Sequence, residues 1–259
     1  MRPLAVIGAA VRAQSRFGLQ LAALLWGVLR EGVWPSIWRR TVRASFRTTL
    51  SRTVGGSLGT IAVTAVIAGL ALVFEAIYWL RTAGQQGQIG HILVIVLFRE
   101  ITPLLVGIIL LGRGGTATVA ELGMMTAEGE IAILRAEGID IFQYMVLPRA
   151  VAFALAGFTL GMVFVVISLI TGFITGSLAG VVNTSIFGFL DNVLRAMTIA
   201  DFAIFPAKLL LIGLVVALAC CMTGLNARAA DTPASLLPRG FTRGMTGILT
   251  VTLILSAII

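Results

Sequence analysis

Long apolar runs are the feature that most limits what this chain can fold into. Four are long and one is short, and a membrane-spanning helix needs about 20 consecutive, mostly apolar residues. Charged residues make up only 12% of the chain, whereas soluble domains use about 25%. The chain is therefore predicted to be an all-α polytopic membrane protein with about five transmembrane helices. The predicted spans are residues 54–80, 89–111, 151–182, 202–222 and 245–259.

The basic residues predict how these spans are oriented. Nine arginines precede residue 54, and the connections 112–150 and 223–244 carry three each. The two alternate connections carry one each, Arg81 and Arg195. Because Lys and Arg accumulate on the cytoplasmic side, this bias places the N-terminus in the cytoplasm. Five crossings then place the C-terminus outside.

The N-terminal segment 1–53 differs from the transmembrane domain 54–259 that follows it. It is basic and carries Trp26, Trp34 and Trp38, and tryptophan is enriched at headgroup depth in membranes. We therefore expect this segment to form an amphipathic helix that lies in the membrane interface.

The residues needed for catalysis are missing. Lys208 is the only lysine and is followed by leucine, so the chain has no phosphate-binding loop, which ends in Lys-Ser or Lys-Thr. His91 is the only histidine, and the adjacent Cys220 and Cys221 lie in an apolar run typical of packing residues. We expect that the chain is not an enzyme and that it holds no metal and no cofactor.

Charges inside the spans are the candidate functional residues. Arg99 and Glu100 fall about ten residues into the second span, roughly 15 Å along a helix, and ionisable residues within a membrane usually mark a pathway. A structural ion pair with a neighbouring helix is the alternative. Pro103 should kink this helix one turn later. In the first span, Glu75 would line a cavity mouth or reach the outer headgroups, and Tyr78 would belong to the interfacial aromatic belt.

The connection 112–150 predicts a short amphipathic helix over residues 126–137 on the cytoplasmic side. Ile131 and Leu134 share one face of it. That face would either dock on a partner or pack against the chain's own helix ends. The supporting signals are Thr126 as N-cap, Glu128 and Glu130 in the first turn, and Gly138 as the stop.

Glycines at four-residue spacing mark the third span. Small residues at this spacing share a helix face and let another helix approach closely. This pattern favours helix packing, within or between subunits, over substrate passage. The glycines are Gly157, Gly161, Gly172, Gly176 and Gly180.

The stretch Leu97–Arg149 carries several fixed elements in order. They are an Arg-Glu-Ile-Thr-Pro helix, the box GRGG, the sequence AELG, the acidic stretch AEGEIAILRAEGID and a final Pro-Arg. This pattern resembles the central region of the MlaE/YrbE permease family. The length, the basic start and the five spans extend the likeness over nearly the whole chain. The chain departs from the family by lacking a Glu-Gln pair near the start of the acidic helix and a proline after Asp140.

The resemblance implies the permease subunit of an ABC-type lipid transporter in a bacterial inner membrane, with a periplasmic C-terminus. Its partners would be a second permease chain, as a homodimer, a cytoplasmic ATPase dimer that hydrolyses ATP, and a periplasmic MCE-domain hexamer. Its substrate would be phospholipid moved between the inner and outer membranes.

The resemblance also implies roles for particular residues. Helix 126–137, with Ile131, Leu134 and the closing Gly138 and Asp140, would be the coupling helix in the ATPase groove. Glu121 and Gly123 would lead into it. The residues near the lipid cavity between two permeases would be Arg99, Glu100, Pro103, Tyr78 and Glu75.

Two other classes of protein would also have apolar spans with buried charges. One is a stand-alone secondary transporter or channel, a class that usually shows inverted repeats; none is evident in five unequal spans. The other is a membrane scaffold subunit that transports nothing. An ATPase and a lipid that co-purify with the chain would separate these alternatives from a permease.

Overall fold

The computed structural model describes residues 2–32, 34, 38–83, 94–178, 180, 185–228 and 230–257. Within these ranges the regular structure is helical and includes no strand, which confirms the predicted all-α class. His91 lies outside the described residues. The helices are α1 (Arg2–Gly32), α2 (Arg40–Ala83), α4 (Thr102–Leu110), α5 (Thr116–Ala127), α6 (Glu130–Ala136), α7 (Leu147–Leu178), α8 (Ile186–Ala196), α9 (Ile199–Leu225) and α10 (Pro233–Ser256), with π-helical segments η3 (Val94–Ile101), η4 (Leu111–Gly115) and η5 (Phe142–Val146).

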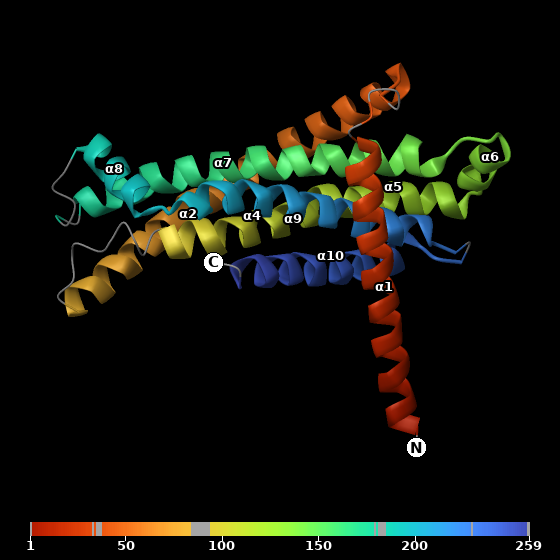
Figure 1. The fold of residues 1–259 in the computed structure, drawn as a ribbon, viewed down its shortest axis with the longest axis horizontal. Coiled ribbons are helices and arrows are strands. Elements are labelled where there is room, and N and C mark those ends of the chain that lie inside the picture. The colour runs from red at the N-terminus through yellow and green to blue at the C-terminus, as the bar shows by residue number, and fades with distance from the viewer. Residues whose placement is uncertain are drawn as a thin grey trace.

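The long helices form a bundle, and α1 crosses it steeply (Figure 1). Helix α7 packs against α2 on one side and α9 on another, while α10 lies along α9. Helix α6 lies at one end of the bundle and α8 lies at the other (Figure 1). A helix that crosses a bundle of spans would lie in the plane of the membrane, and this placement of the N-terminal segment stays a prediction. Trp26 and Trp34 are exposed.

Four helical stretches are long and apolar enough to cross a membrane: Arg40–Leu72, Ile95–Ala127, Phe142–Leu178 and Ile199–Leu225. These four helices therefore indicate that the chain is a membrane protein. The fifth predicted span is not in this set, although α10 begins at Pro233, twelve residues before the predicted start.

At three of the predicted span boundaries the helix extends beyond the predicted span, for one physical reason. Helix α2 passes through residue 53 without a break, so the basic segment and the first span share one helix. The second stretch continues to Ala127, and the third begins at Phe142. Hydropathy locates the apolar part of a helix, whereas the helix itself continues into polar sequence until a turn stops it.

Glycines permit the closest approach of α7 to α9. A Cβ atom at Gly157 would lie 2.9 Å from the Leu209 carbonyl oxygen, and one at Gly161 would lie 2.5 Å from Leu209 Cδ1. Gly172 and Gly176 are also buried on α7. The placement of Gly180 on this helix face was wrong, because α7 ends at Leu178. Gly180 instead has a φ of +67°, which favours glycine in a turn.

The tightest of these helix contacts is at Gly213 of α9, and adding a methyl group there should destabilise the fold. A Cβ atom there would lie 2.2 Å from the carbonyl oxygen of Phe153 on α7. Because this neighbour is backbone, the helices must separate, and Gly213→Ala should lower the free energy of unfolding by about 1–3 kcal/mol. Thermal unfolding in detergent, followed by circular dichroism, measures the change.

Gly59→Ala is the matched control for Gly213→Ala. Gly59 lies within α2, and a Cβ atom there would meet nothing within 4 Å. The higher helix propensity of alanine should leave this variant unchanged or stabilise it by up to about 1 kcal/mol. Equal effects at the two glycines would contradict the tight α7–α9 contact.

Candidate functional site

Arg99 forms a bidentate ion pair with Asp201. Arg99 lies in η3 and Asp201 in the first turn of α9, with Nε–Oδ1 and Nη2–Oδ2 distances of 2.7 and 2.9 Å. The Asp201 side chain is 2% exposed and the Arg99 side chain 22%. Asp201 also accepts hydrogen bonds from the backbone N–H and the hydroxyl of Thr198, at 2.9 and 2.8 Å, and so caps α9. One carboxylate thus ties the second membrane helix to the start of α9.

Glu100 belongs to a second group, centred on Lys208. The buried Lys208 ammonium group donates to the carbonyl oxygen of Arg99 and to Ser256 Oγ of α10, the latter at 2.7 Å. Ser256 in turn donates to Glu100 Oε1 at 2.6 Å, and Lys208 Nζ lies 3.8 Å from that same oxygen. The two groups together join η3, α9 and α10.

The expected mid-membrane position of Arg99 and Glu100 stays a prediction. Arg99 pairs with Asp201 in the N-terminal turn of α9, and Glu100 follows it in η3. Both charges therefore lie toward one end of the bundle. The structure contains the interhelical ion pair that was the alternative interpretation of these charges. Pro103 is buried near the start of α4, directly after η3. Proline has no backbone N–H to donate, and the π-helical turn of η3 lies immediately before it.

Two further candidates for the lipid pathway lie on α2. Glu75 is exposed near the C-terminal end of this helix. The Tyr78 side chain lies outside the described residues. The structure therefore brings Arg99 and Glu100 to one charged cluster.

Asp201, Lys208 and Ser256 are members of this cluster that the sequence analysis missed. A signal was present for two of them. Thr198 and Asp201 have the spacing of a capping box, and Lys208 is the only lysine, within an apolar run. A charge inside a span predicts a partner of opposite charge, but one sequence does not say which helix faces it.

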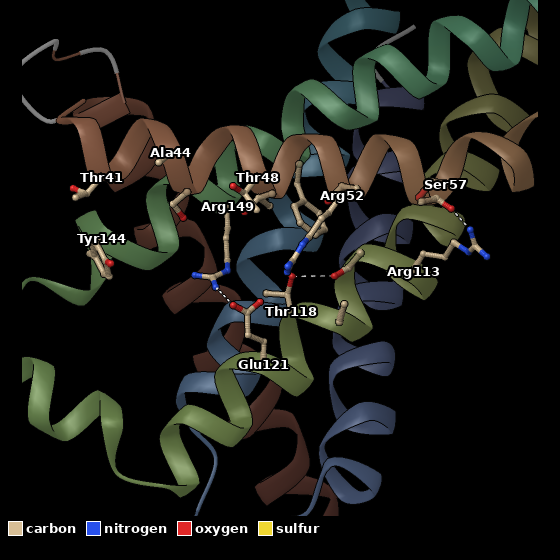
Figure 2. A pocket seen from close by; sticks show the side chains of 17 residues that line it. Thr41, Ala44, Thr48, Arg52, Ser57, Arg113, Thr118, Glu121, Tyr144 and Arg149 are labelled. Atoms are coloured by element: carbon tan, nitrogen blue, oxygen red, sulfur yellow. Dashed lines mark hydrogen bonds and ion pairs between the residues drawn. The ribbon is translucent and has the colours of Figure 1, made fainter.

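The predicted cytoplasmic residues lie at the opposite end of the same membrane helices. Glu121 of α5 accepts a hydrogen bond from Arg149 Nη2 of α7 at 2.8 Å (Figure 2). A Cβ atom at Gly123 would lie 2.6 Å from Leu236 Cδ1, so this glycine allows α10 to pack on α5. Asp140 Oδ1 accepts from the Phe142 backbone N–H at 2.9 Å, at the start of η5.

The predicted helix 126–137 is shorter than expected. Thr126 does not cap it, because its hydroxyl donates to the Leu122 carbonyl at 2.7 Å inside α5. Glu128 follows the end of α5, and Gly129, with a φ of +83°, turns the chain before α6 begins at Glu130. The stop at Gly138, with a φ of +79°, agrees with the prediction.

The face of α6 expected to dock is turned inward. Ile131 is 3% exposed and packs with the core, and Leu134 is partly buried against it. This agrees with packing against the chain's own helix ends. Ile133, on the other face, is 60% exposed. The exposed face of α6 therefore presents Ile133 as its large apolar side chain.

A family model described as Permease MlaE matches residues 46–259. The chain belongs to the MlaE permease family. This family match and the four apolar helices agree that the chain is a membrane permease.

Three relatives of this MlaE-family chain show how far the likeness extends. The intermembrane phospholipid transport system permease protein MlaE of Haemophilus influenzae is 27% identical over 125 residues, 48% of this chain and 46% of that protein. A probable ABC transporter permease protein of Rickettsia typhi is 24% identical over 168 residues, 65% and 64% of the two chains. The chloroplastic protein TRIGALACTOSYLDIACYLGLYCEROL 1 of Arabidopsis thaliana is 33% identical over 119 residues, 46% and 33% of the two chains. The matched segments thus span from a third to just under two thirds of these relatives.

Proposed function

We propose that this chain is the permease subunit of an ATP-driven transporter that moves phospholipids between the inner and outer membranes of a bacterium. The observation that carries the proposal is the match of residues 46–259 to the permease family. The Haemophilus influenzae relative is named as a phospholipid transport permease, which supports the substrate class. ATP hydrolysis is assigned to a separate subunit, because the only lysine of this chain is buried in an apolar helix.

Coupling to the ATPase is assigned to α6. This short helix lies at one end of the bundle (Figure 1), and its exposed Ile133 offers an apolar contact to a groove on a cytoplasmic partner. Its other face is anchored to the core through Ile131. Movement of α6 would therefore pass into α5 and α7, to which it is joined by the turns at Gly129 and Gly138.

The lipid pathway is assigned to the end of the bundle that carries Arg99 and Glu100. Arg99 remains partly exposed while paired with Asp201, and half of the Glu100 side chain is exposed. A second copy of the chain would complete the cavity wall beside them, and a periplasmic MCE-domain hexamer would receive the lipid there. The N-terminus would be cytoplasmic and the C-terminus periplasmic.

Lipid co-purification tests the substrate class. The chain would be expressed with and without a partner ABC ATPase and purified in detergent. The bound lipid would be quantified as phosphorus per chain. A transporter should retain phospholipid above the level of an unrelated membrane protein of similar size. A complex without phospholipid would favour the scaffold alternative. Lipid and transport activity without any ATPase would favour a stand-alone transporter.

A further inference from the structure

A cavity of about 690 Å³ lies at the end of the bundle opposite the Arg99 cluster. It is bounded by the N-terminal half of α2, by η4 and α5, and by η5 and α7 (Figure 2). Its volume is within the range of small-molecule sites, about 300–1,000 Å³. Its lining includes several hydroxyl side chains and three arginines, which favours a ligand with an anionic group.

The charges of the cavity are not balanced. Its lining includes three arginines, Arg52, Arg113 and Arg149, and one carboxylate, Glu121. Glu121 is paired with Arg149. Arg113 donates to the carbonyl oxygen of Gly56, a neutral acceptor. No carboxylate of the described residues pairs with Arg52 or Arg113, so the cavity keeps two positive charges.

One hydroxyl group without a hydrogen-bond partner lies beside these arginines. Ser57 is fully buried, and its Oγ has no hydrogen-bond partner within the described structure. It lines the cavity next to Arg113 (Figure 2). Thr48 of the same helix lines the cavity toward its other end. A buried hydroxyl without a partner is costly, and an acceptor in the cavity would satisfy it.

The cavity lies where a lipid headgroup would be expected. It follows α2 from Thr41 to Ser57, and this stretch is the junction between the basic part of the helix and its apolar part, which begins at Val54. Basic residues at such a junction lie at headgroup depth and attract anionic groups. Arginine binds phosphate through paired N–H donors.

We propose that this cavity is a phosphoryl-binding site that takes the headgroup phosphate of a phospholipid from the leaflet at this end of the bundle. Arg52 and Arg113 supply the charge, and Ser57 donates its hydroxyl to a phosphoryl oxygen. The site is separate from the Arg99 cluster. It requires only a membrane chain, so a failure of transport would leave it intact, and its own failure would leave the transport proposal intact.

Lipid binding by the full chain in a nonionic detergent tests this site. Short-chain phosphatidylglycerol is titrated into the wild type and Arg52→Gln, and bound lipid is counted by native mass spectrometry. Loss of one charge-assisted contact should weaken binding by about tenfold. Ser57→Ala, which removes no charge and keeps the helix, should weaken binding in the same direction.

Arg47→Gln is the matched control, because Arg47 is exposed on α2 and does not line the cavity. It should bind phosphatidylglycerol as the wild type does.

Diacylglycerol, which lacks the phosphate, should not bind at the site. If excess inorganic phosphate leaves the lipid bound, the headgroup is the ligand; displacement that depends on Arg52 assigns the same site to free phosphate. The proposal would be overturned if Arg52→Gln and Arg47→Gln lost phosphatidylglycerol binding to the same extent. It would also be overturned if diacylglycerol bound as well as phosphatidylglycerol.

Discussion

Replacing Asp201 with asparagine should lower the free energy of unfolding by about 2–4 kcal/mol, because breaking a buried ion pair leaves one charge without its partner. Asp201 is 2% exposed and accepts two hydrogen bonds from Arg99. The estimate lies toward the lower part of the usual range because the Arg99 side chain is 22% exposed. Asn keeps the size of the side chain, so the loss reports the charge. Thermal or denaturant unfolding in one detergent measures it.

An exposed ion pair of similar length provides the control. Asp191 and Arg195 of α8 are 2.7 Å apart, with side chains 56% and 78% exposed. Asp191→Asn should therefore cost no more than about 0.5 kcal/mol. Adding Arg99→Gln to Asp201→Asn should recover part of the lost stability, since no unpaired charge remains. The interhelical pairing would be contradicted if Asp201→Asn cost no more than Asp191→Asn.

Two isoleucines two residues apart on α6 should respond in opposite ways to aspartate. Ile133 is 60% exposed, so Ile133→Asp should leave the chain folded and remove the apolar contact proposed for the ATPase. Ile131 is 3% exposed, so Ile131→Asp would bury a charge and should lower the free energy of unfolding by more than about 3 kcal/mol. The measurements are the amount of ATPase that co-purifies per permease chain and the unfolding midpoint of the permease alone.

Ile133→Ala serves as a milder variant in this comparison. Alanine removes most of the apolar side chain without adding charge, so ATPase recovery should fall by less than with aspartate. A folded Ile133→Asp chain that retains its full share of ATPase would exclude the exposed face of α6 as the contact. Loss of the ATPase only with the unfolding Ile131→Asp variant would lead to the same conclusion.

The apolar runs predicted the helices well because burial in lipid needs long hydrophobic stretches whatever their neighbours are. Glycine spacing was informative for the same reason: Gly157 and Gly161 lie where α7 approaches α9. Both signals are local in sequence. The fold class and much of the helix content could therefore be obtained without coordinates.

The site was less predictable because its contacts join distant parts of the chain. Arg99 and Asp201 are 102 residues apart, and Glu100 and Ser256 are 156 residues apart. The charges suggested partners without identifying them. The start of α6 was misplaced because Thr126 resembles a cap in sequence, whereas in the structure the chain turns at Gly129. The exposure of Ile133 rather than Ile131 depends on how α6 packs against its neighbours, which helical periodicity alone does not specify.

ATP-dependent lipid transfer tests the proposed function most directly. The permease and its co-purified ATPase would be reconstituted in liposomes that contain a fluorescent phospholipid, and transfer to an acceptor would be followed with ATP and with a non-hydrolysable analogue. The proposal predicts phospholipid movement that requires ATP hydrolysis and is lost in Ile133→Asp together with the ATPase. Transfer at the same rate without ATP, or vigorous ATP hydrolysis by the complete complex without lipid movement, would contradict it.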